Sequence, residues 1–420
     1  MDASLRSWIE VGRESDFPVQ NIPFGIFKTP GDKARAATRI GETVIDLNAL
    51  ALHGFLDGLG LAHDIFSHDT LNPFMALGRP LCRTVRERIA GIFEENNPLL
   101  RDHPDKQAEI LFPLHDVQML MPVHVGDYTD FYSSIEHATN VGIMFRDPAN
   151  ALFPNWKHLP VGYHGRSSSI VVSGTGIHRP KGQTKADTAD VPEFGPSKQV
   201  DFELELAFIT CKKSLLGQSV SAAEAEDHIF GMVIFNDLSA RDIQRWEYVP
   251  LGPFLAKNFG SVISPWIVTL DAMEPFRVAG PKQEPAVLPY LQAEGDRNFD
   301  VQLDVFIMPE NQPEQLVSHS NFKYMYWNPA QQLAHQTVNG CNINVGDIYG
   351  SGTISGPTPD SLGSMLEIAW KGTRPVKMAD GSERKFINDN DTVIMRGYCV
   401  KEDLRIGFGE AVTKILPANP

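Results

Sequence analysis

The stretch Val200-Asp201-Phe202-Glu203-Leu204-Glu205-Leu206-Ala207-Phe208 alternates apolar and acidic side chains. This period of two residues predicts a β-strand with one apolar face, formed by Val200, Phe202, Leu204, Leu206 and Phe208. The opposite face would carry Asp201, Glu203 and Glu205, where neighbouring carboxylates repel each other. A bound cation would neutralise them, whereas a solvated face on a half-buried strand would need none. From this stretch alone we favour the solvated face, because exposed acidic faces are common.

The composition predicts an ordinary globular protein with more than one core. The chain has 420 residues, of which 42% are hydrophobic and 21% charged, and this length favours two domains. Its net charge of −15 argues against nucleic acid and anionic membranes as partners. A local cluster of Arg and Lys can still bind a small anion, so an anionic substrate remains compatible with this charge.

Cysteine usage and the N-terminal segment indicate a reducing compartment. The four cysteines, Cys82, Cys211, Cys341 and Cys399, are far apart and form no C-x-x-C pair. Residues 1–17 lack the apolar core of a signal peptide, and no run of eighteen apolar residues suggests a membrane span. We therefore expect a cytoplasmic protein. The 30 prolines and 34 glycines indicate many turns and mostly β structure.

The turn signals predict a small N-terminal unit over residues 1–118 and a large β-rich domain over residues 119–420. In the first unit, Gly41-Glu42 predicts a hairpin within residues 34–47, and such short strands suggest a small barrel. Helices are predicted from Asn48 to Leu59 and from Val85 to Glu95. In the second, we expect strands over 229–236, 263–270 and 301–308, a helix over 328–338 that Asn328 caps, and a surface loop over 181–198.

Further carboxylates lie where they could complete an acidic cluster. Asp130 lies among aromatic and small residues, and Asp237 directly follows an apolar strand. Asp237 alone could equally cap the next helix. Together with Glu203 and Glu205 these residues offer only oxygen ligands, a set that prefers Ca²⁺ or Mg²⁺ to zinc or copper. Because the four are scattered along the chain, their spacing alone indicates such a site only weakly.

Nitrogen-bearing side chains near these carboxylates have two interpretations each. His137 could accept a proton from water, although one of thirteen histidines is more often structural. Lys257, among apolar and aromatic residues, could pair with a carboxylate, bind substrate, or extend from a turn into solvent. Arg241, Gln244 and Tyr248 would share one face of a helix. Their spacing alone favours an ordinary polar face over a row of donors.

The sequence around these residues resembles the fumarylacetoacetase family. The resemblance is carried by Gly126-Asp127-Tyr128-Thr129-Asp130-Phe131-Tyr132-Ser133-Ser134, Glu136 to Gly142, Leu159 to Arg166, Asp237 to Asp242, Trp246 to Phe254, Ser351 to Gly356 and Gly363 to Glu367. These motifs span most of the predicted second domain in order. Shorter members of the wider superfamily lack the N-terminal unit, which this chain keeps.

The resemblance implies an N-terminal SH3-like barrel, a C-terminal β-roll domain and a homodimer. It also implies hydrolysis of the carbon–carbon bond of 4-fumarylacetoacetate, the last step of tyrosine and phenylalanine breakdown, with Ca²⁺ or Mg²⁺ held by Asp130, Glu203, Glu205 and Asp237. The acidic face of the opening stretch is then better interpreted as a metal face. Lys257 and Ser261 match a second cation contact, where Lys257 could offer only its backbone carbonyl, because an ammonium has no lone pair.

The remaining roles are implied by the same resemblance. His137 matches the general base and Glu367 the carboxylate that orients it, while Arg241, Gln244 and Lys257 match donors to the developing oxyanion. The matched substrate contacts are Tyr132, Arg146, Gln244, Tyr248 and Thr353. Two positions depart from the pattern expected of animal members: Leu238 replaces Trp, and Ser261 replaces Thr but keeps a hydroxyl. Neither departure affects the base or the four carboxylates.

Two other functions are compatible with parts of the sequence. Another metal-dependent enzyme of the superfamily, acting on a smaller ketoacid, fits less well because the chain has both the His137–Glu367 pair and the long N-terminal unit. A calcium-binding structural protein also fits less well. The chain has no calcium-loop motif of fixed spacing, and a purely structural ion has no use for His137.

Overall fold

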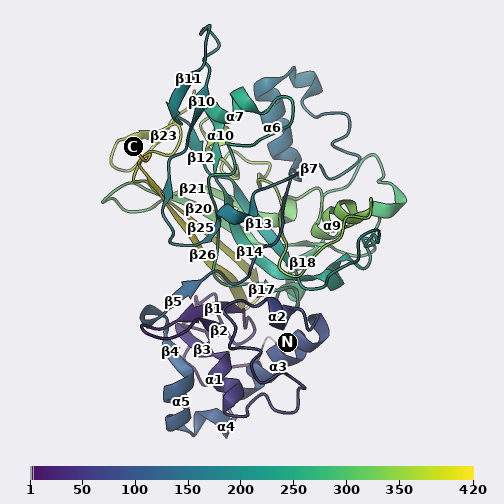
Figure 1. Ribbon diagram of the computed structural model, residues 1–420, viewed down its shortest axis with the longest axis vertical. Coiled ribbons are helices and arrows are strands. Elements are labelled where there is room, and N and C mark those ends of the chain that lie inside the picture. Colours follow the sequence, from purple (N-terminus) through teal and green to yellow (C-terminus); the bar gives the residue numbers. More distant parts are fainter. Residues whose placement is uncertain (1, 3) are drawn as a thin grey trace.

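A computed structural model describes residue 2 and residues 4–420. The chain is mostly β, with 28% of residues in strands and 22% in helices, as the turn-rich composition predicts. Figure 1 shows the N-terminal segment, with β1 to β5 and α1 to α5, below the larger part that carries the remaining strands. Among the described residues, no helix combines the length and apolarity needed to cross a bilayer.

The N-terminal part is built on one five-stranded sheet in the order β4-β3-β2-β1-β5. Its strands are β1 Gly25–Lys28, β2 Arg35–Ile40, β3 Thr43–Asp46, β4 Leu111–Pro113 and β5 Gln118–Leu120. The helices are α1 Leu47–Leu52, α2 Asn72–Met75, α3 Arg79–Ile92, α4 Pro98–Arg101 and α5 Pro104–Ile110. The predicted hairpin at Gly41-Glu42 is confirmed. The helix predicted from Asn48 begins one residue earlier, at Leu47, and its N-cap is Asp46, which accepts from the backbone N–H of Ala49.

The larger part contains two extended sheets. One has the order β7-β6-β22-β13-β14-β16-β8, with β17 beside β14, and the other β21-β20-β25-β26-β9. The first comprises β6 Tyr128–Phe131, β7 Gly162–His164, β8 Ile170–Val172, β13 Leu204–Thr210, β14 Ile229–Asp237, β16 Ser261–Ile263, β17 Val268–Thr269 and β22 Ile348–Gly350. The second comprises β9 Ile177–His178, β20 Gln302–Met308, β21 Gln315–Asn321, β25 Thr392–Lys401 and β26 Leu404–Leu416.

Shorter elements cover these sheets. The strand pairs are β10 Lys181–Thr184 with β11 Glu193–Pro196, β12 Val200–Asp201 with β15 Ser239–Ala240, β18 Arg277–Val278 with β19 Asn298–Phe299, and β23 Val376–Lys377 with β24 Glu383–Arg384. The helices are α6 Ile135–Phe145, α7 Arg241–Glu247, α8 Leu270–Met273, α9 Pro329–Thr337 and α10 Met365–Ile368. The predicted cap of α9 is confirmed, since Asn328 forms a capping box with Gln331.

The opening stretch is interrupted, and only its second part, in β13, lies at the centre of the first sheet. It comprises β12 and β13, separated by residues 202–203, so the prediction of one continuous strand is wrong. Two different partners cause the break: β12 pairs with β15, whereas β13 pairs with β14 and β22. The predicted apolar face is confirmed, because Val200, Phe202, Leu204, Leu206 and Phe208 all lie in one core that also includes residues of β20 and β25.

The other face of β13 is buried too, which excludes a solvated acidic face. Ala207 and Ile209 belong to a second core, shared with N-terminal residues such as Phe24, Ile26 and Phe74. Burial on both faces is the environment in which an acidic side chain needs a specific partner. Glu203 and Glu205 are therefore buried on the face of the opening stretch that points away from the second sheet.

Two further sequence predictions need correction. Residues 181–198 are not only a loop, because β10 and β11 pair over four residues to form the hairpin at the top of Figure 1. Residues 263–270 are not one strand: β16 ends at Ile263, and β17 begins at Val268 after a break at Ser264-Pro265. A proline has no N–H to donate to a sheet, and this accounts for the break between β16 and β17.

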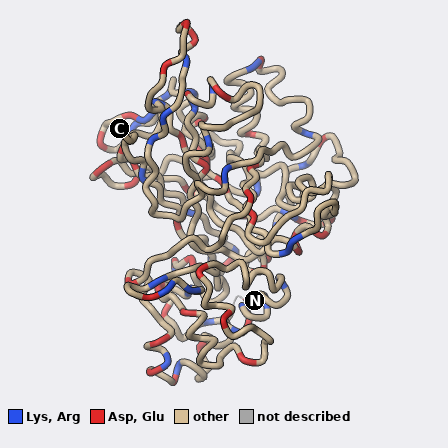
Figure 2. The backbone as a smooth tube through the Cα atoms, in the orientation of Figure 1, with Lys and Arg blue, Asp and Glu red and all other residues tan. Residues whose placement is uncertain are grey.

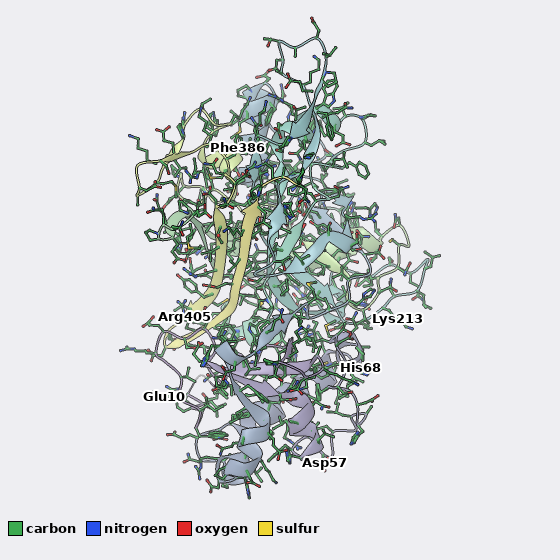
Figure 3. The ribbon with its side chains drawn as sticks, turned by 60° about the vertical axis from the view of Figure 1, so that its left-hand side comes forward. Glu10, Asp57, His68, Lys213, Phe386 and Arg405 are labelled. Carbon is green, nitrogen blue, oxygen red and sulfur yellow. The ribbon has the colours of Figure 1, made fainter. Side chains whose placement is uncertain are left out.

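The long strands β25 and β26 reach from the upper part to the N-terminal part. In Figure 3, Arg405 marks this lower end of the strand pair, while Phe386 lies in the upper part. Arg405 Nε donates to Asp16 Oδ1 at 2.7 Å, which ties β26 to the N-terminal segment. Figure 2 shows Lys and Arg interspersed with Asp and Glu over both parts, so the charge of −15 is not confined to one region.

Candidate metal centre and catalytic cavity

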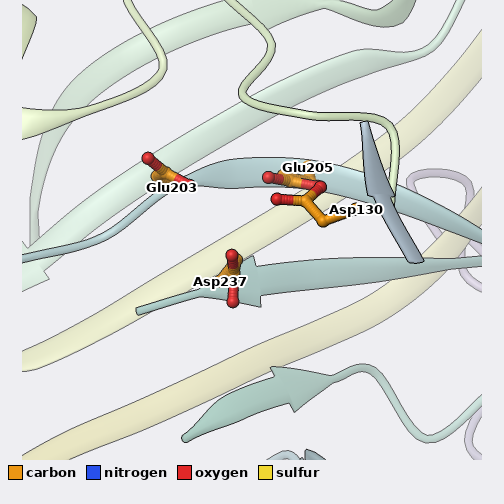
Figure 4. Close-up of side chains that lie close together, drawn as sticks. All are labelled: Asp130, Glu203, Glu205 and Asp237. Carbon is orange, nitrogen blue, oxygen red and sulfur yellow. The ribbon is translucent and has the colours of Figure 1, made fainter. Parts of the chain in front are cut away.

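The four predicted carboxylate ligands come together in one buried cluster. Asp130, Glu203, Glu205 and Asp237 each offer an oxygen that lies within 4.8 Å of the oxygens of the other three. Figure 4 shows the cluster between neighbouring strands, with Asp237 at the end of its strand. All four are buried, with exposures of 5% or less. The ends of β6, β13 and β14 thus place residues that are over 100 positions apart in sequence around one point.

Backbone geometry makes room for this cluster. A Cβ on Gly350 would lie 2.8 Å from Glu205 Oε2 and 2.9 Å from Asp130 Oδ1, so a larger residue here would push the two carboxylates away. The next strand residues turn sharply, with Gly352 at a φ of +80°. The N–H of Gly352 donates to Glu205 Oε2 at 2.9 Å. Gly350, the last residue of β22, and Gly352 just after the strand therefore shape one side of the cluster.

Two buried cations lie beside the acidic cluster. Lys257 Nζ donates to Glu203 Oε2 and, at 2.7 Å, to Asp237 Oδ2. Arg241 Nη2 forms an ion pair with Glu203 Oε1 at 2.8 Å. Ser261 Oγ donates to the other oxygen of Asp237 at 2.8 Å. In this arrangement Lys257 and Ser261 contact the cluster through their side chains.

The cations neutralise one side of the cluster and leave the other crowded with negative charge. Burial alone would raise the pKa of Glu203, but Lys257 and Arg241 lower it to about 2. By contrast, burial and the Asp237 carboxylate raise the pKa of Asp130 well above its usual range. Burial and Asp130 do the same to the pKa of Glu205. Asp130 and Glu205 are thus the carboxylates that lack compensating charge.

The donor set fits a hard divalent cation. Asp130 Oδ1 and Glu205 Oε1 are buried and have no hydrogen-bond partner within the described part of the chain. Unpaired buried carboxylate oxygens are costly unless something binds them. Four carboxylates without a sulfur or nitrogen ligand are the coordination chemistry of Ca²⁺ or Mg²⁺. The alternative assignment of Asp237 as a helix cap is excluded, because Ala240 occupies the N-cap of α7.

A histidine–carboxylate pair lies next to the cluster. His137 Nδ1 is 2.6 Å from Glu367 Oε2, and both side chains are at most 4% exposed. Ser134 caps α6 by accepting from the N–H of His137, which fixes the first turn of the helix. Glu367 also accepts hydrogen bonds from Asn140 at 2.9 Å, Ser355 at 2.9–3.0 Å and Ser364 at 2.9 Å.

These bonds determine what the pair can do. Although burial opposes the effect, His137 and its other donors lower the pKa of Glu367. A carboxylate held ionised against Nδ1 keeps the proton on that nitrogen, so Nε2 presents its lone pair. The edge of the Tyr132 ring packs on the imidazole, with ring centroids 5.2 Å apart. His137 is therefore oriented as a general base.

One cavity of about 550 Å³ contains the proposed reacting groups. Its lining includes Asp130, Glu203, His137, Arg241 and Lys257 together with all five predicted substrate contacts, Tyr132, Arg146, Gln244, Tyr248 and Thr353. Arg241 and Gln244 lie on α7 and Tyr248 at its C-cap, so the shared helix face is a cavity wall. Glu205, Ser261 and Glu367 lie behind the lining. Sequence spacing alone had favoured an ordinary polar face here.

Several residues that hold the site were not singled out from the sequence. Tyr163 donates to Asp237 at 3.2 Å, and Asn140, Ser355 and Ser364 hold Glu367. All four fall inside the motifs that carry the family resemblance, which was the available signal. Asp201 was assigned to the acidic face with Glu203 and Glu205, but it lies outside the cluster and pairs with Arg241 at 2.8 Å.

Comparisons with known proteins cover nearly the whole chain. A family model described as fumarylacetoacetate (FAA) hydrolase C-terminal matches residues 128–415, and one described as fumarylacetoacetase N-terminal matches residues 20–122. Curated proteins named fumarylacetoacetase are similar end to end. The one from Dictyostelium discoideum is 53% identical, covering 99% of each chain, and that from Caenorhabditis elegans is 51% identical, covering 99% of this chain and 100% of its own.

The human fumarylacetoacetase is 49% identical and covers 98% of this chain and 99% of its own. Among solved structures, one described as a fumarylacetoacetate hydrolase from psychrophilic Exiguobacterium antarcticum superposes with a TM-score of 0.53 at 18% identity. It covers 94% of this chain and 99% of that chain. At this identity the structural likeness shows the fold alone, whereas the sequence matches show the family.

Proposed function

Because the chain belongs to the fumarylacetoacetase family, we propose that it hydrolyses the carbon–carbon bond of 4-fumarylacetoacetate to fumarate and acetoacetate, the last step of tyrosine and phenylalanine breakdown. The observation that carries the proposal is that His137, paired with the buried Glu367, lines the same cavity as Asp130 and Glu203 of the four-carboxylate cluster. A structural calcium protein would need the cluster but not the oriented base.

In the proposed mechanism, Glu367 holds the proton on Nδ1 of His137, and Nε2 takes a proton from water. The resulting hydroxide attacks the ketone carbonyl that is bonded to the vinylic carbon and that becomes a carboxyl group of fumarate. Cleavage of the bond between this carbonyl carbon and the neighbouring methylene then expels an enolate, and the proton held on His137 converts this enolate to acetoacetate. A divalent ion held by Asp130, Glu203, Glu205 and Asp237 would polarise the substrate carbonyl as a Lewis acid.

The cationic groups would stabilise the negative charge that develops on the attacked carbonyl oxygen. Against the effect of burial, Asp237 and Glu203 raise the pKa of Lys257, so it stays protonated. Arg241 stays charged for the same reason, beside Glu203 and Asp201. Gln244 accepts from Arg241 Nη1 through its oxygen at 3.2 Å, which leaves its amide N–H groups for the substrate. One such fixed donor contributes roughly 3 kcal/mol.

Arg146 and Tyr132 would bind one of the two substrate carboxylates. Arg146 lies at the C-cap of α6, with its guanidinium 4.1 Å above the Phe153 ring, and it forms no ion pair with any carboxylate of the described residues. An unpaired guanidinium in a cavity can bind a carboxylate without first breaking an ion pair. Tyr248 and Thr353 would contact the rest of the substrate.

The finer description of the fold and assembly belongs to the same proposal. From the family resemblance we propose an SH3-like barrel over residues 1–118, a β-roll domain over 119–420, a homodimer and a cytoplasmic location. Exposed apolar side chains support an interface near the cavity mouth: Val249 is 65%, Leu251 96% and Phe254 63% exposed. The shared core of the two parts supports a single catalytic unit.

The test is the loss of fumarylacetoacetate absorbance with purified protein, after EDTA treatment and after addition of Ca²⁺ or Mg²⁺. We expect turnover that EDTA stops and a divalent ion restores, and we expect His137→Ala to lose turnover while still binding the ion in a calorimetric titration. A folded, metal-loaded protein that cleaves only smaller acylpyruvates would refute the proposed substrate. Retained turnover in His137→Ala would remove this residue from the base role.

A further inference from the structure

Asp201 is a fully buried carboxylate that belongs to neither the metal cluster nor the cavity lining. Its Oδ2 accepts from Arg241 Nε at 2.8 Å and from the backbone N–H of Leu366 at 3.0 Å. Its Oδ1 accepts from the backbone N–H of Met365 at 2.7 Å. One carboxylate therefore uses three hydrogen bonds to join the first residue of α7 to the first two residues of α10.

The two elements joined in this way carry different parts of the proposed machinery. Arg241 extends from Asp201 towards Glu203 and Gln244 and lines the cavity. Glu367 directly follows Leu366, so the bonds to Met365 and Leu366 fix the backbone from which Glu367 reaches His137. Asp201 thus fixes the position of Arg241, a proposed oxyanion donor, relative to Glu367, which orients the base.

Rigid backbone connects this point to the metal ligands. Glu203 lies two residues after Asp201 and pairs with Ser364 as a β-bridge, and the N–H of Leu204 donates to the carbonyl of Gly363 at 2.9 Å. The segment before α10 is therefore attached to the strand that carries Glu203 and Glu205. A shift of α10 would move Glu367 relative to the cluster.

We propose that Asp201 is a positioning residue, which holds Arg241 and the Glu367 segment in the mutual geometry that the transition state requires. The inference rests on the proposed function. A misplacement of reacting groups by about 1 Å can lower a rate on the order of 100-fold without any loss of the groups themselves. Asp201 does not line the cavity, and its hydrogen bonds go to Arg241 and the α10 backbone, so it would act only through them.

The competing interpretation is that Asp201 stabilises the fold and nothing else, and the chain contains a matched control. Asp46 is also buried, at 3% exposure, pairs with Nε of an arginine, Arg35, and accepts from a backbone N–H in the first turn of a helix, that of Ala49 at 3.0 Å. It lies in the N-terminal sheet, and neither Asp46 nor Arg35 lines the cavity.

The test compares Asp201→Asn with Asp46→Asn in the metal-loaded protein. An asparagine offers one acceptor oxygen and places an N–H₂ group where the carboxylate accepted from a donor. We expect Asp201→Asn to lower kcat on the order of 100-fold, with KM and the calorimetric Ca²⁺ affinity within about threefold of wild type. Asp46→Asn should lower the melting temperature about as much as Asp201→Asn does, but it should keep the wild-type kcat.

A folded Asp201→Asn protein with wild-type kcat would overturn the inference. If this variant does not fold, Asp201→Glu decides, because it keeps the charge and moves the carboxylate by one methylene. We expect a fall in kcat with KM and Ca²⁺ affinity kept, and wild-type kcat would again overturn the inference. Wild-type protein that does not cleave fumarylacetoacetate would instead refute the proposed function.

Discussion

Replacing Glu367 by glutamine removes one negative charge next to the base while preserving the shape of the side chain. In the native site this carboxylate accepts from four side-chain groups, on His137, Asn140, Ser355 and Ser364. A glutamine presents an N–H₂ group to some of these donors. If it faces Nδ1 of His137, the imidazole must carry its proton on Nε2 and cannot accept one from water.

The size of the effect follows from the geometry. His137 becomes positively charged when it takes the proton, and Glu367 stabilises this cation from 2.6 Å between the bonded atoms. For charge centres about 4 Å apart and an effective dielectric constant of about 20, the attraction is about 4 kcal/mol. Each 1.4 kcal/mol or so corresponds to a tenfold change in rate. We therefore expect kcat to fall about 10³-fold.

The assay is steady-state cleavage of fumarylacetoacetate with saturating Ca²⁺, together with a calorimetric Ca²⁺ titration of each variant. Glu136→Gln is the matched control, since Glu136 is the neighbouring carboxylate on α6 and contacts Ser134 rather than the imidazole. We expect Glu136→Gln to keep kcat and both variants to keep Ca²⁺ affinity. A Glu367→Gln enzyme within tenfold of the wild-type kcat would refute the assignment of Glu367 as the partner of the base.

Two further predictions concern charge burial. Glu205→Gln should raise the melting temperature of the EDTA-treated protein by about 2 °C or more, because it removes the repulsion between the carboxylates of Glu205 and Asp130. It should also reduce the rise in melting temperature that added Ca²⁺ produces. If that rise stays as large as in the wild type, Glu205 is not a Ca²⁺ ligand. Burial raises the pKa of Asp347 to about 6, so its ionisation opposes folding: its contribution is favourable below pH 4 and lost as the pH rises through 6. Between pH 4 and pH 6 the wild type should therefore lose up to about 3 kcal/mol of its free energy of unfolding, measured with urea, and Asp347→Asn should not show this loss. If the free energy of unfolding changes with pH equally in both proteins, the prediction is wrong.

The alternation of the opening stretch was sufficient to predict one side of the core. The period of two is a local property, and the face of Phe202, Leu204 and Leu206 is buried as the pattern requires. The interruption at residues 202–203 could not be predicted, because it depends on β12 and β13 having different partners that are remote in sequence. Alternation also could not distinguish Asp201 from Glu203, since both point away from the same core.

The acidic cluster shows a similar limit. Residue type indicated a hard cation, but Asp130 and Asp237 could be connected to Glu203 only through the family resemblance. What brings them together is the pairing of β6 with β22 and of β13 with β14, which no spacing encodes. The hydrogen bonds from Ser355 and Ser364 to Glu367 could not be predicted for another reason. Serine is common in turns, and only the three-dimensional structure shows which serine donates to a carboxylate.

Charge balance explains how a chain of net charge −15 can accept a dianion. Around the cluster, five buried carboxylates, including Asp201, form ion pairs with only Lys257 and Arg241 among the described residues, so the region is negative and would repel the substrate. A divalent cation removes most of this excess and leaves the unpaired Arg146 to attract a carboxylate. Substrate affinity and metal affinity are therefore coupled, because the charge of each ligand makes binding of the other more favourable. By thermodynamic linkage, the substrate must strengthen metal binding by the same factor as the metal strengthens substrate binding. Lys257 cannot replace the metal in this role, because its single charge is already shared by Glu203 and Asp237.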